Sequence, residues 1–414
     1  MTNYEARLKR IMDAAALKEP DRVPCCPVNQ TFPILHAGHT MAEVLYDFDK
    51  GAEAYIKYAE QFEPDLVWGH HWIHMGMGPM FELMDPKIIQ WAGQPGSILH
   101  ENSIHQWIEF AVLEDDEMDM FGQDYTGWVL EKGFPKTIGL LEPLGKMGLS
   151  RMNPGYLGVP QLAQGFSSPE AKEMITKLWK IHDLNSEIMG KTAALDSKLE
   201  EMGYPVLMNG FAVVPFDNYS DNFRGTIDTM FDLTDRREIV QKYNEMNLPQ
   251  TYAQVEMFSK IFPGRFCFMP LHKGMDKFMS DKDYGELYWK DLQAIILHII
   301  KCGMVPYIYT EGPYTSRLEF LKDVPPGKVI YHFEECDMLL AKKVLGDVAC
   351  IAGGFNVTML NFASKQQVID EVKRLIDGCA QGGGYIFETS CGMDEVKIEN
   401  IEAMFETVKT YGKY

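Results

Sequence analysis

The chain lacks a run of apolar residues long enough to cross a bilayer. Its start, MTNYEARLKRIMDAAALKEPDRVP, also lacks the apolar core of a signal peptide. Basic residues are few, since 39 Lys and Arg stand against 59 Asp and Glu, which gives a net charge of −20. Such a charge argues against nucleic acid or an anionic membrane as the partner. We therefore expect a cytoplasmic protein.

The eight cysteines form no CxxC pair and have no regular spacing, which fits reduced thiols better than a disulfide framework. Internal repeats and low-complexity linkers are absent as well. Apolar residues make up 46% of the chain and charged residues 24%, a balance typical of a globular protein with a substantial core. We expect residues 1–414 to form one compact domain.

Short apolar runs alternate with longer helical patterns along most of the chain. Helices are predicted at 284–301, 335–345 and 365–381, the last with Ser364 as its N-cap. Regular strand–helix–strand succession implies parallel strands joined by crossovers, and eight such strands predict an α/β fold, the (β/α)₈ TIM barrel. The predicted strands are 22–28, 66–72, 205–213, 265–271, 305–309, 328–333, 348–353 and 384–388.

The segment 76–156 interrupts this rhythm between the second and third predicted strands. It is rich in Trp, Gly and Pro and contains no clear strand–helix alternation. An insertion at that point follows a strand end, so it would lie over the barrel mouth. We expect it to act as a lid or as a wall of the pocket.

Two potential metal ligands stand at the ends of predicted strands. Glu311 follows the fifth strand in PYIYTEGPYTSRLE, and Cys391 follows the eighth in YIFETSCGM. The carboxyl ends of barrel strands meet at one mouth, so the two side chains could share a site there, with His272 after the fourth strand as the best-placed third ligand. A metal would give a buried Glu311 a partner, and an ion pair with Arg317 or a lysine is the alternative.

The run WGHHWIHMGM places three histidines at and behind the end of the second predicted strand. Strand alternation sends His70 and His71 to opposite sides, so at most one of them would face the barrel interior. A metal site is therefore the weaker interpretation of this run. Substrate contact or general acid catalysis is the stronger one.

Amide and aromatic side chains also fall at predicted strand ends. The amides could orient a substrate oxygen or satisfy loop backbone. The aromatic rings could line a pocket for a planar substrate or simply pack the barrel ends. The amides are Asn29, Asn209 and Asn356, and the aromatic residues are Trp68, Trp72, Phe211, Phe216, Tyr309, Tyr314 and Phe333.

Several segments in this order resemble the uroporphyrinogen decarboxylase superfamily over nearly the whole chain. They are RLKRIMDAAALKEPDRVP, GHTMAEVLYDFDKGAEAYIKYAEQFEPDLVW, RGTIDTMFDLTDRREIVQKYNEM, FEECDMLLAKKVLGDVACIAGGFNVTML and GGGYIFETSCGMDEVKIENIEAMFETVKTYGKY. The decarboxylases themselves carry an Arg-rich segment after the first strand, which holds porphyrinogen carboxylates. The corresponding segment here, CCPVNQTFPILHAG, has no Arg, so porphyrinogen decarboxylation is disfavoured.

The resemblance extends to the superfamily's zinc-dependent methyltransferases, which exchange methyl groups with a cobamide. Their thiol-methylating members bind zinc through a His-x-Cys pair after the fifth strand and a Cys after the eighth. In this chain Tyr309 and Glu311 match the pair, and Cys391 is retained. A harder oxygen donor implies a more Lewis-acidic zinc, suited to polarising an ether oxygen. The chain is similar in this respect to corrinoid-dependent O-demethylases.

The resemblance thus implies a zinc-dependent enzyme that moves a methyl group from a methoxylated aromatic to the cobalt of a partner. Because the chain has no D-x-H-x-x-G motif, the cobamide would be carried by a separate corrinoid protein. Methyl transfer involving a thiol or a methylamine-type compound is the main alternative. A decarboxylase and a non-catalytic corrinoid- or tetrapyrrole-binding barrel are disfavoured, and the oligomeric state stays open.

Roles follow from these positions. We expect Glu311, Tyr309 and His71 to act in catalysis, and His272, Glu311 and Cys391 to hold zinc. The residues expected to contact the substrate are Asn29, His70, Trp72, Asn209, Phe211 and Phe333.

Overall fold

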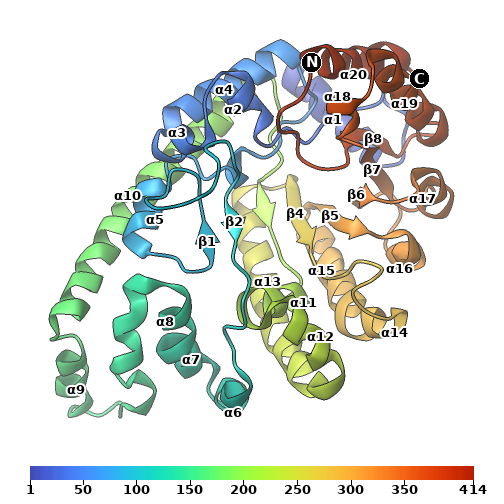
Figure 1. Cartoon of the computed structure of the whole chain (residues 1–414). Helices are drawn as coiled ribbons and strands as arrows, with labels where there is room; N and C mark the ends of the chain where they lie inside the picture. Colours follow the sequence, from blue (N-terminus) through green and yellow to red (C-terminus); the bar gives the residue numbers. More distant parts are fainter.

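The computed structural model describes all 414 residues. Its main sheet has six parallel strands in the order β3-β4-β5-β6-β7-β8, so each strand pairs with the one that precedes it (Figure 1). The predicted parallel arrangement is confirmed. The strands are β3 (Gly210–Phe211), β4 (Phe266–Leu271), β5 (Val305–Pro313), β6 (Ile330–Glu335), β7 (Cys350–Phe355) and β8 (Tyr385–Thr389).

Two further extended segments continue this sheet. Cys25 forms an isolated parallel bridge with Phe387 of β8, and Val67 forms one with Val206 just before β3. Between them, the Asp65 N–H donates to the Cys25 carbonyl at 2.9 Å. Through these contacts the two segments connect β8 to β3, and the resulting architecture is of the TIM-barrel type. The predicted strands 22–28 and 66–72 are thus reduced to isolated bridges.

Helices cover the outside of the sheet, and both chain ends lie on the same side of the molecule (Figure 1). The helices after the strands are α13 (Arg237–Ile261), α15 (Lys290–Lys301), α17 (Met338–Leu345), α19 (Lys365–Cys379) and α20 (Ile398–Tyr411). The shorter ones in the barrel half are α11 (Pro215–Tyr219), α12 (Gly225–Asp235), α14 (Asp281–Asp283), α16 (Leu318–Leu321) and α18 (Met359–Phe362). The N-terminal helices are α1 (Asn3–Ala15), α2 (Phe32–His36), α3 (Met41–Tyr46) and α4 (Phe48–Phe62).

The local signals that predicted these helices are visible in the structure. Ser364 caps α19 with a capping box, since its hydroxyl accepts from the Gln367 N–H and the Gln367 side chain accepts from the Ser364 N–H. In α15 the apolar stripe is buried, with Leu292, Ile295 and Ile299 on the inner face. The helical pattern predicted at 284–301 is therefore continuous, although its first part, Tyr284–Trp289, is a π-helical turn.

Alternation along the strands divides their side chains between two cores. In β4, Phe266 and Phe268 belong to an interior cluster of 16 buried hydrophobic residues. Their neighbours Cys267 and Met269 belong to a cluster of 61 buried residues that includes the inner faces of the helices. The period of two fixes which residues of each strand can reach the barrel mouth.

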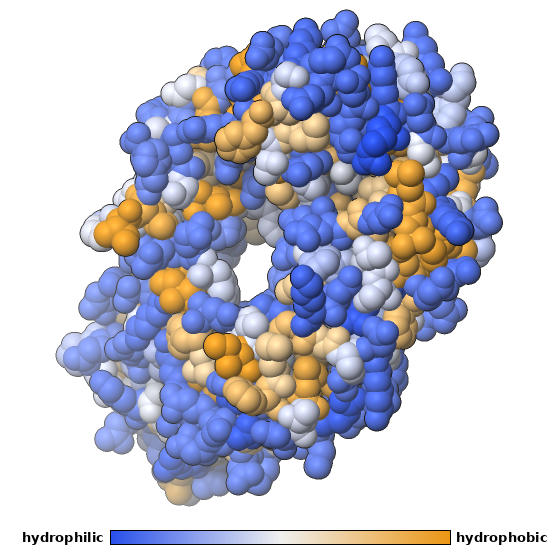
Figure 2. All heavy atoms as spheres, turned by 45° about the vertical axis from the view of Figure 1, so that its right-hand side comes forward, coloured by the Kyte–Doolittle hydropathy of each residue, from blue (hydrophilic) through white to orange (hydrophobic).

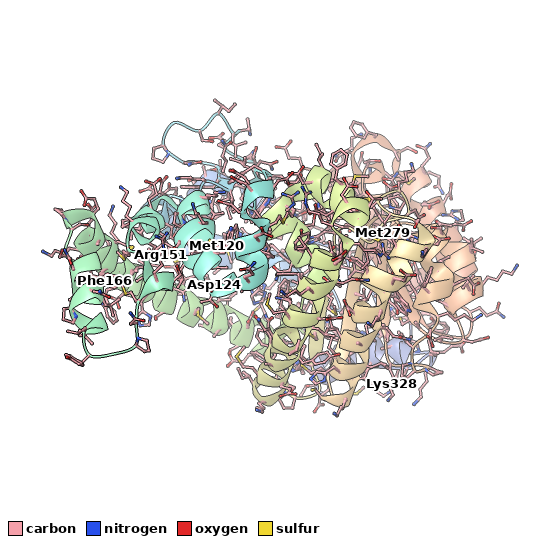
Figure 3. All side chains as sticks on the ribbon, turned by 90° about the horizontal axis from the view of Figure 1, so that it is seen from below. Met120, Asp124, Arg151, Phe166, Met279 and Lys328 are labelled. Atoms are coloured by element: carbon pink, nitrogen blue, oxygen red, sulfur yellow. The ribbon has the colours of Figure 1, made fainter.

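Between Val67 and β3 the chain builds a large excursion. Its elements are α5 (Gly78–Met84), the antiparallel pair β1 (Ile89–Gln90) and β2 (Gln106–Trp107), α6 (Met118–Gln123), α7 (Tyr125–Trp128), α8 (Phe134–Thr137), α9 (Gly158–Gly165) and α10 (Pro169–Glu201). Figure 3 shows Met120, Asp124, Arg151 and Phe166 on one side of the molecule, and Met279 and Lys328 on the other. The 33-residue α10 leads the chain back to the barrel.

The surface is hydrophilic over much of the face drawn in Figure 2, with apolar patches and an opening near the middle. None of the helices combines the length and the apolar character that crossing a membrane requires.

Candidate active site at the barrel mouth

A cavity of about 220 Å³ lies at the carboxyl ends of the barrel strands. Four aromatic side chains line it, together with a few polar groups and no Lys or Arg. Two of its lining residues, Ile104 and His105, come from the predicted insertion 76–156. The lining residues are Val28, Gln30, Trp68, Gly69, Trp72, Ile104, His105, Phe268, Pro270, His272, Tyr309, Glu311 and Gly392.

The aromatic walls support one another edge to face. The Trp68 ring lies 5.8 Å from the Phe268 ring and 5.7 Å from the Tyr309 ring, measured between centroids. Trp72 meets Phe268 in the same manner at 5.1 Å. Edge-to-face packing at these distances is favourable, so the rings form a preorganised apolar wall.

His272 and Glu311 form the polar end of the cavity. His272 Nε2 lies 3.6 Å from Glu311 Oε1, and His272 Nδ1 lies 2.5 Å from Asp221 Oδ2. Burial raises the pKa of Glu311 to about 7, although His272 acts to lower it. Burial alone would lower the pKa of His272, but Asp221 and the neighbouring carboxylates raise it to about 9. Near neutral pH, this end of the cavity therefore holds a proton donor.

Asp217 shapes the loop that carries His272. Its buried carboxylate accepts from the backbone N–H groups of His272 and Lys273 at 3.0 and 2.9 Å, and from the Tyr288 hydroxyl at 2.6 Å. Burial raises the pKa of Asp217 to about 6. The three donors hold the chain after β4 so that His272 faces the cavity.

The ligands predicted for zinc do not converge. A zinc site needs its donor atoms close together, and the atoms of His272, Glu311 and Cys391 do not form a group within 4.8 Å of one another. Burial raises the pKa of the Cys391 thiol, and Glu334 adds to this effect. The residues as they stand do not fit this ion, and only the backbone next to Cys391, at Gly392, reaches the cavity.

A polar network that the sequence analysis missed lies beneath the cavity. The fully buried Glu388 of β8 accepts from Trp68 Nε1 at 3.3 Å and from the Tyr307 hydroxyl, and it lies 2.6 Å from His332 Nδ1. The Tyr309 ring stacks on His332 with 4.2 Å between centroids. The buried Glu388 carboxylate thus holds Trp68 directly and Tyr309 through His332, and both rings line the cavity. Strand alternation was the only available signal, because it turns Tyr307, Tyr309 and His332 inward together.

Two aromatic residues predicted to contact substrate do not line the cavity. Phe333 belongs to the helix-facing core, because in β6 the inward position falls on its neighbour His332. The prediction for Phe333 was wrong because the inward-facing positions of β6 are shifted by one residue from those expected. Phe211 packs behind the wall, 6.4 Å from the Phe268 ring and 6.2 Å from the Trp72 ring.

The amides predicted to contact substrate are also outside the cavity. Asn29 donates to the Trp68 carbonyl at 2.6 Å and accepts from the Trp68 N–H at 2.8 Å, so its side chain joins the first two extended segments. Asn209 is buried, and its Oδ1 has no hydrogen-bond partner. The cavity is lined next to Asn29 by Val28 and Gln30 instead.

His70 and His71 also lie outside the cavity lining. Both rings turn toward Asp196 of α10, whereas alternation had predicted opposite directions. The chain leaves the extended conformation at Gly69, whose φ is +80°, and residues 70–72 form a 3₁₀ turn, η1. Trp72, at the end of this turn, is the residue that reaches the cavity.

Comparison with known proteins places the chain beside one family model and a solved structure of similar fold. The family model described as uroporphyrinogen decarboxylase (URO-D) matches residues 140–411. A solved structure, a methyltransferase from Methanosarcina mazei, is similar to this chain with a TM-score of 0.59 at 12% sequence identity, over 98% of each chain. At that identity the likeness establishes the fold. Among curated proteins, none matches the chain.

Proposed function

Because the chain belongs to the uroporphyrinogen decarboxylase family, we propose that it is a methyltransferase of this fold, acting on a methoxylated aromatic compound. The methyl group would pass to the cobalt of a partner corrinoid protein. The observation that carries the proposal is the cavity itself, in which Trp68, Trp72, Phe268 and Tyr309 surround a space that ends at Glu311. Flat aromatic walls with one acid at the end suit a ring that bears an ether oxygen.

The size and charge of the cavity argue against a porphyrinogen. At about 220 Å³ it is smaller than pockets for drug-sized ligands, which begin at roughly 300 Å³. No Lys or Arg lines it, so the carboxylates of a porphyrinogen would be buried without partners. A substrate with a single ring is the better match.

The acidic end of the cavity would supply the proton that cleavage of an aryl ether requires. An aryl ether is unreactive because its leaving group is poor, and a proton delivered to the oxygen turns that group into a phenol. Protonated Glu311, next to cationic His272, is placed to deliver it as the carbon–oxygen bond breaks. The bonding electrons stay on oxygen while the methyl group moves to the acceptor, and solvent reprotonates the acid. A corrinoid bound to the partner would supply the low-valent cobalt that accepts the methyl group.

Tyr309 would assist from the wall. Burial raises the pKa of its hydroxyl well above the usual range, so the side chain stays a hydrogen-bond donor at neutral pH. Its ring is held by stacking on His332, which restricts where the hydroxyl can point. The zinc ion predicted at this mouth is tested by whether Cys391→Ser lowers the metal content of the purified protein.

The same walls favour one alternative substrate class. Aromatic rings beside a carboxylate also attract quaternary ammonium groups through cation–π contacts. Trp68, Trp72 and Tyr309 with Glu311 fit that pattern, so a methylated amine is the second candidate.

The proposal is tested by methyl transfer to reduced cobalamin, used in place of the partner. The protein is incubated separately with an uncharged methoxybenzene, a methylated amine and a methylated thiol, and methylcobalamin is followed by its absorbance. We expect methoxybenzene-dependent methylation with one phenol released for each methyl group. Turnover of the amine or the thiol alone would reverse the ranking, and tight cobalamin binding without turnover would indicate a binding protein.

A further inference from the structure

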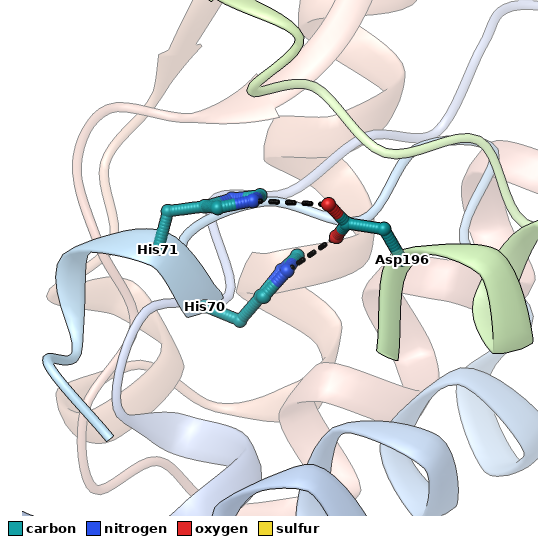
Figure 4. Close-up of side chains that lie close together, drawn as sticks. All are labelled: His70, His71 and Asp196. Atoms are coloured by element: carbon teal, nitrogen blue, oxygen red, sulfur yellow. Dashed lines mark hydrogen bonds and ion pairs between the residues drawn. The ribbon is translucent and has the colours of Figure 1, made fainter. Parts of the chain in front are cut away.

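A second cluster of potential ligands lies outside the cavity. His70, His71 and Asp196 are the one group of three or more His, Cys, Asp or Glu side chains whose donor atoms all lie within 4.8 Å of one another. His70 Nε2 is 2.6 Å from Asp196 Oδ1, and His71 Nε2 is 3.3 Å from Asp196 Oδ2 (Figure 4). Two imidazoles and a carboxylate are a common donor set for zinc.

The backbone explains how neighbouring histidines reach the same point. Gly69 turns the chain out of the extended segment, and η1 (His70–Trp72) follows. Successive residues of such a turn project to adjacent sides, so the two rings lie together with centroids 3.8 Å apart. They face α10, whereas Gly69 and Trp72 face the cavity.

Asp196 is the one polar partner of both rings, and it is reached through Nε2 of each. The side chains of His71 and Asp196 keep 19% and 28% of their surface exposed. Solvent thus reaches one side of the cluster, where water could complete the coordination of an ion held by three protein ligands.

We propose that His70, His71 and Asp196 bind a divalent ion of the zinc class, in the layer between the barrel wall and α10. Tetrahedral zinc separates its ligand atoms by about 3.3 Å, which matches the distance from His71 Nε2 to Asp196 Oδ2. His70 Nε2, which lies 2.6 Å from the other carboxylate oxygen, would move slightly to bind the same ion. The ion joins η1 to α10 and thereby fixes Trp72 in the cavity wall. This site shares no residue with the set predicted at Glu311 and Cys391.

The first test is zinc binding to the intact protein. Metal-free protein is dialysed against graded zinc and analysed by mass spectrometry for metal, together with the variants Asp196→Asn and His71→Ala. Asp183→Asn, an exposed aspartate on the same helix, is the matched control. We expect equimolar zinc in the wild type and the control. In the two ligand variants, affinity should fall by more than the roughly 10–100-fold that losing an outer-shell partner costs.

A second readout locates the ion. Cobalt(II) substituted at a nitrogen and oxygen site shows visible d–d absorption without the thiolate charge-transfer band that a Cys391 ligand would add. Unaltered zinc binding by Asp196→Asn, or loss of zinc only in Cys391→Ser, would overturn the proposal. If a variant does not fold, melting curves of the wild-type protein are measured instead. Zinc should raise the Tm of the wild type, and EDTA should reverse the rise. Absence of both binding and stabilisation in the wild type refutes the site.

Discussion

Glu311 keeps 45% of its side chain exposed, and a histidine Nε2 lies 3.6 Å from its carboxylate. Further carboxylates, from Glu334, Asp217 and Asp221, act to raise its pKa. Sequence position alone suggested a metal ligand, because the residue stands at a strand end where the resembled family has one. In the structure the nearest potential partner is His272, whose pKa of about 9 makes it a cation at neutral pH. Glu311 thus lines the cavity, and its local electrostatics favour the proton transfer proposed for it.

The pH dependence of turnover tests this role. The pKa of Glu311 is raised to about 7, so the acid is protonated below that pH and ionised above it. A general acid must carry its proton, so we expect kcat to fall as pH rises through about 7. Glu311→Gln should lower kcat by roughly 10²–10⁴-fold and remove that limb of the profile.

Glu319→Gln serves as the control for this experiment, because Glu319 is exposed on α16 and remote from the cavity lining. Its pH profile should match the wild type. A Glu311→Gln variant that is correctly folded and keeps the same falling limb would contradict the assignment.

The role of the buried network around Glu388 can be tested by measuring the free energy of unfolding. Glu388→Ala leaves the Trp68 indole, the Tyr307 hydroxyl and His332 without their shared acceptor. Each buried group left unpaired costs about 1 kcal/mol or more, so we expect a loss of at least roughly 3 kcal/mol in urea unfolding. Glu402→Ala, at an exposed position of α20, should stay within about 0.5 kcal/mol of the wild type. Equal effects of the two substitutions would contradict a structural role for the network.

At the scale of single elements, the short turn η1 and strand β6 gave the clearest departures from expectation. Along β6 the period of two held, but the inward register belongs to His332, so Phe333 faces the helices. At η1 the period itself changed, since a glycine with φ of +80° ended the extended segment one residue before His70. The face on which a strand residue lies can be predicted from alternation only if the register and the end of the strand are known. A single sequence gives neither of them to within one residue.

Gly69 offers a direct test of that turn. An added Cβ would meet the backbone of Gln30 at 3.2 Å, in addition to the strain of a left-handed conformation. Gly96 has a similar φ of +78° but no neighbour within 4 Å. We expect Gly96→Ala to cost about 1–2 kcal/mol through the conformational strain alone, and Gly69→Ala to cost more. Urea unfolding measures both, and equal losses would mean that the close approach to Gln30 is unimportant.

At the scale of the whole molecule, the N-terminal segments complete the barrel without a regular ladder of strand hydrogen bonds. Asp65 compensates for this, because its fully buried carboxylate bonds to Arg10 and Arg22, each at 2.6 Å, and accepts from the Cys25 N–H at 2.8 Å. The residue thus ties α1 and the first extended segment to the second. Closure of the architecture rests on side-chain as well as backbone contacts.

Asp65→Ala should consequently weaken the closure. Removing one member of a buried ion-pair network typically costs about 3–5 kcal/mol, because it leaves charges unpaired. We expect that loss in urea unfolding and faster hydrogen exchange in residues 22–28 and 385–389. Asp21→Ala is the matched control, since Asp21 pairs with the same Arg10 but keeps 66% of its side chain exposed, and it should cost at most about 1 kcal/mol. Unchanged exchange in both segments would contradict this account of closure.

The sequence alone determined the parallel α/β architecture, the positions of the later strands and helices, and the cavity residues Trp72, His272, Tyr309 and Glu311. These features follow from periodicity, capping residues and strand ends, all of which are properties of neighbouring residues. Only the tertiary structure decided that His70 and His71 meet Asp196, that Glu388 gathers three partners, and that Cys391 stays apart from His272 and Glu311. Such convergence joins residues that are 56 to 320 positions apart, and its geometry depends on how whole elements pack, which no local pattern encodes.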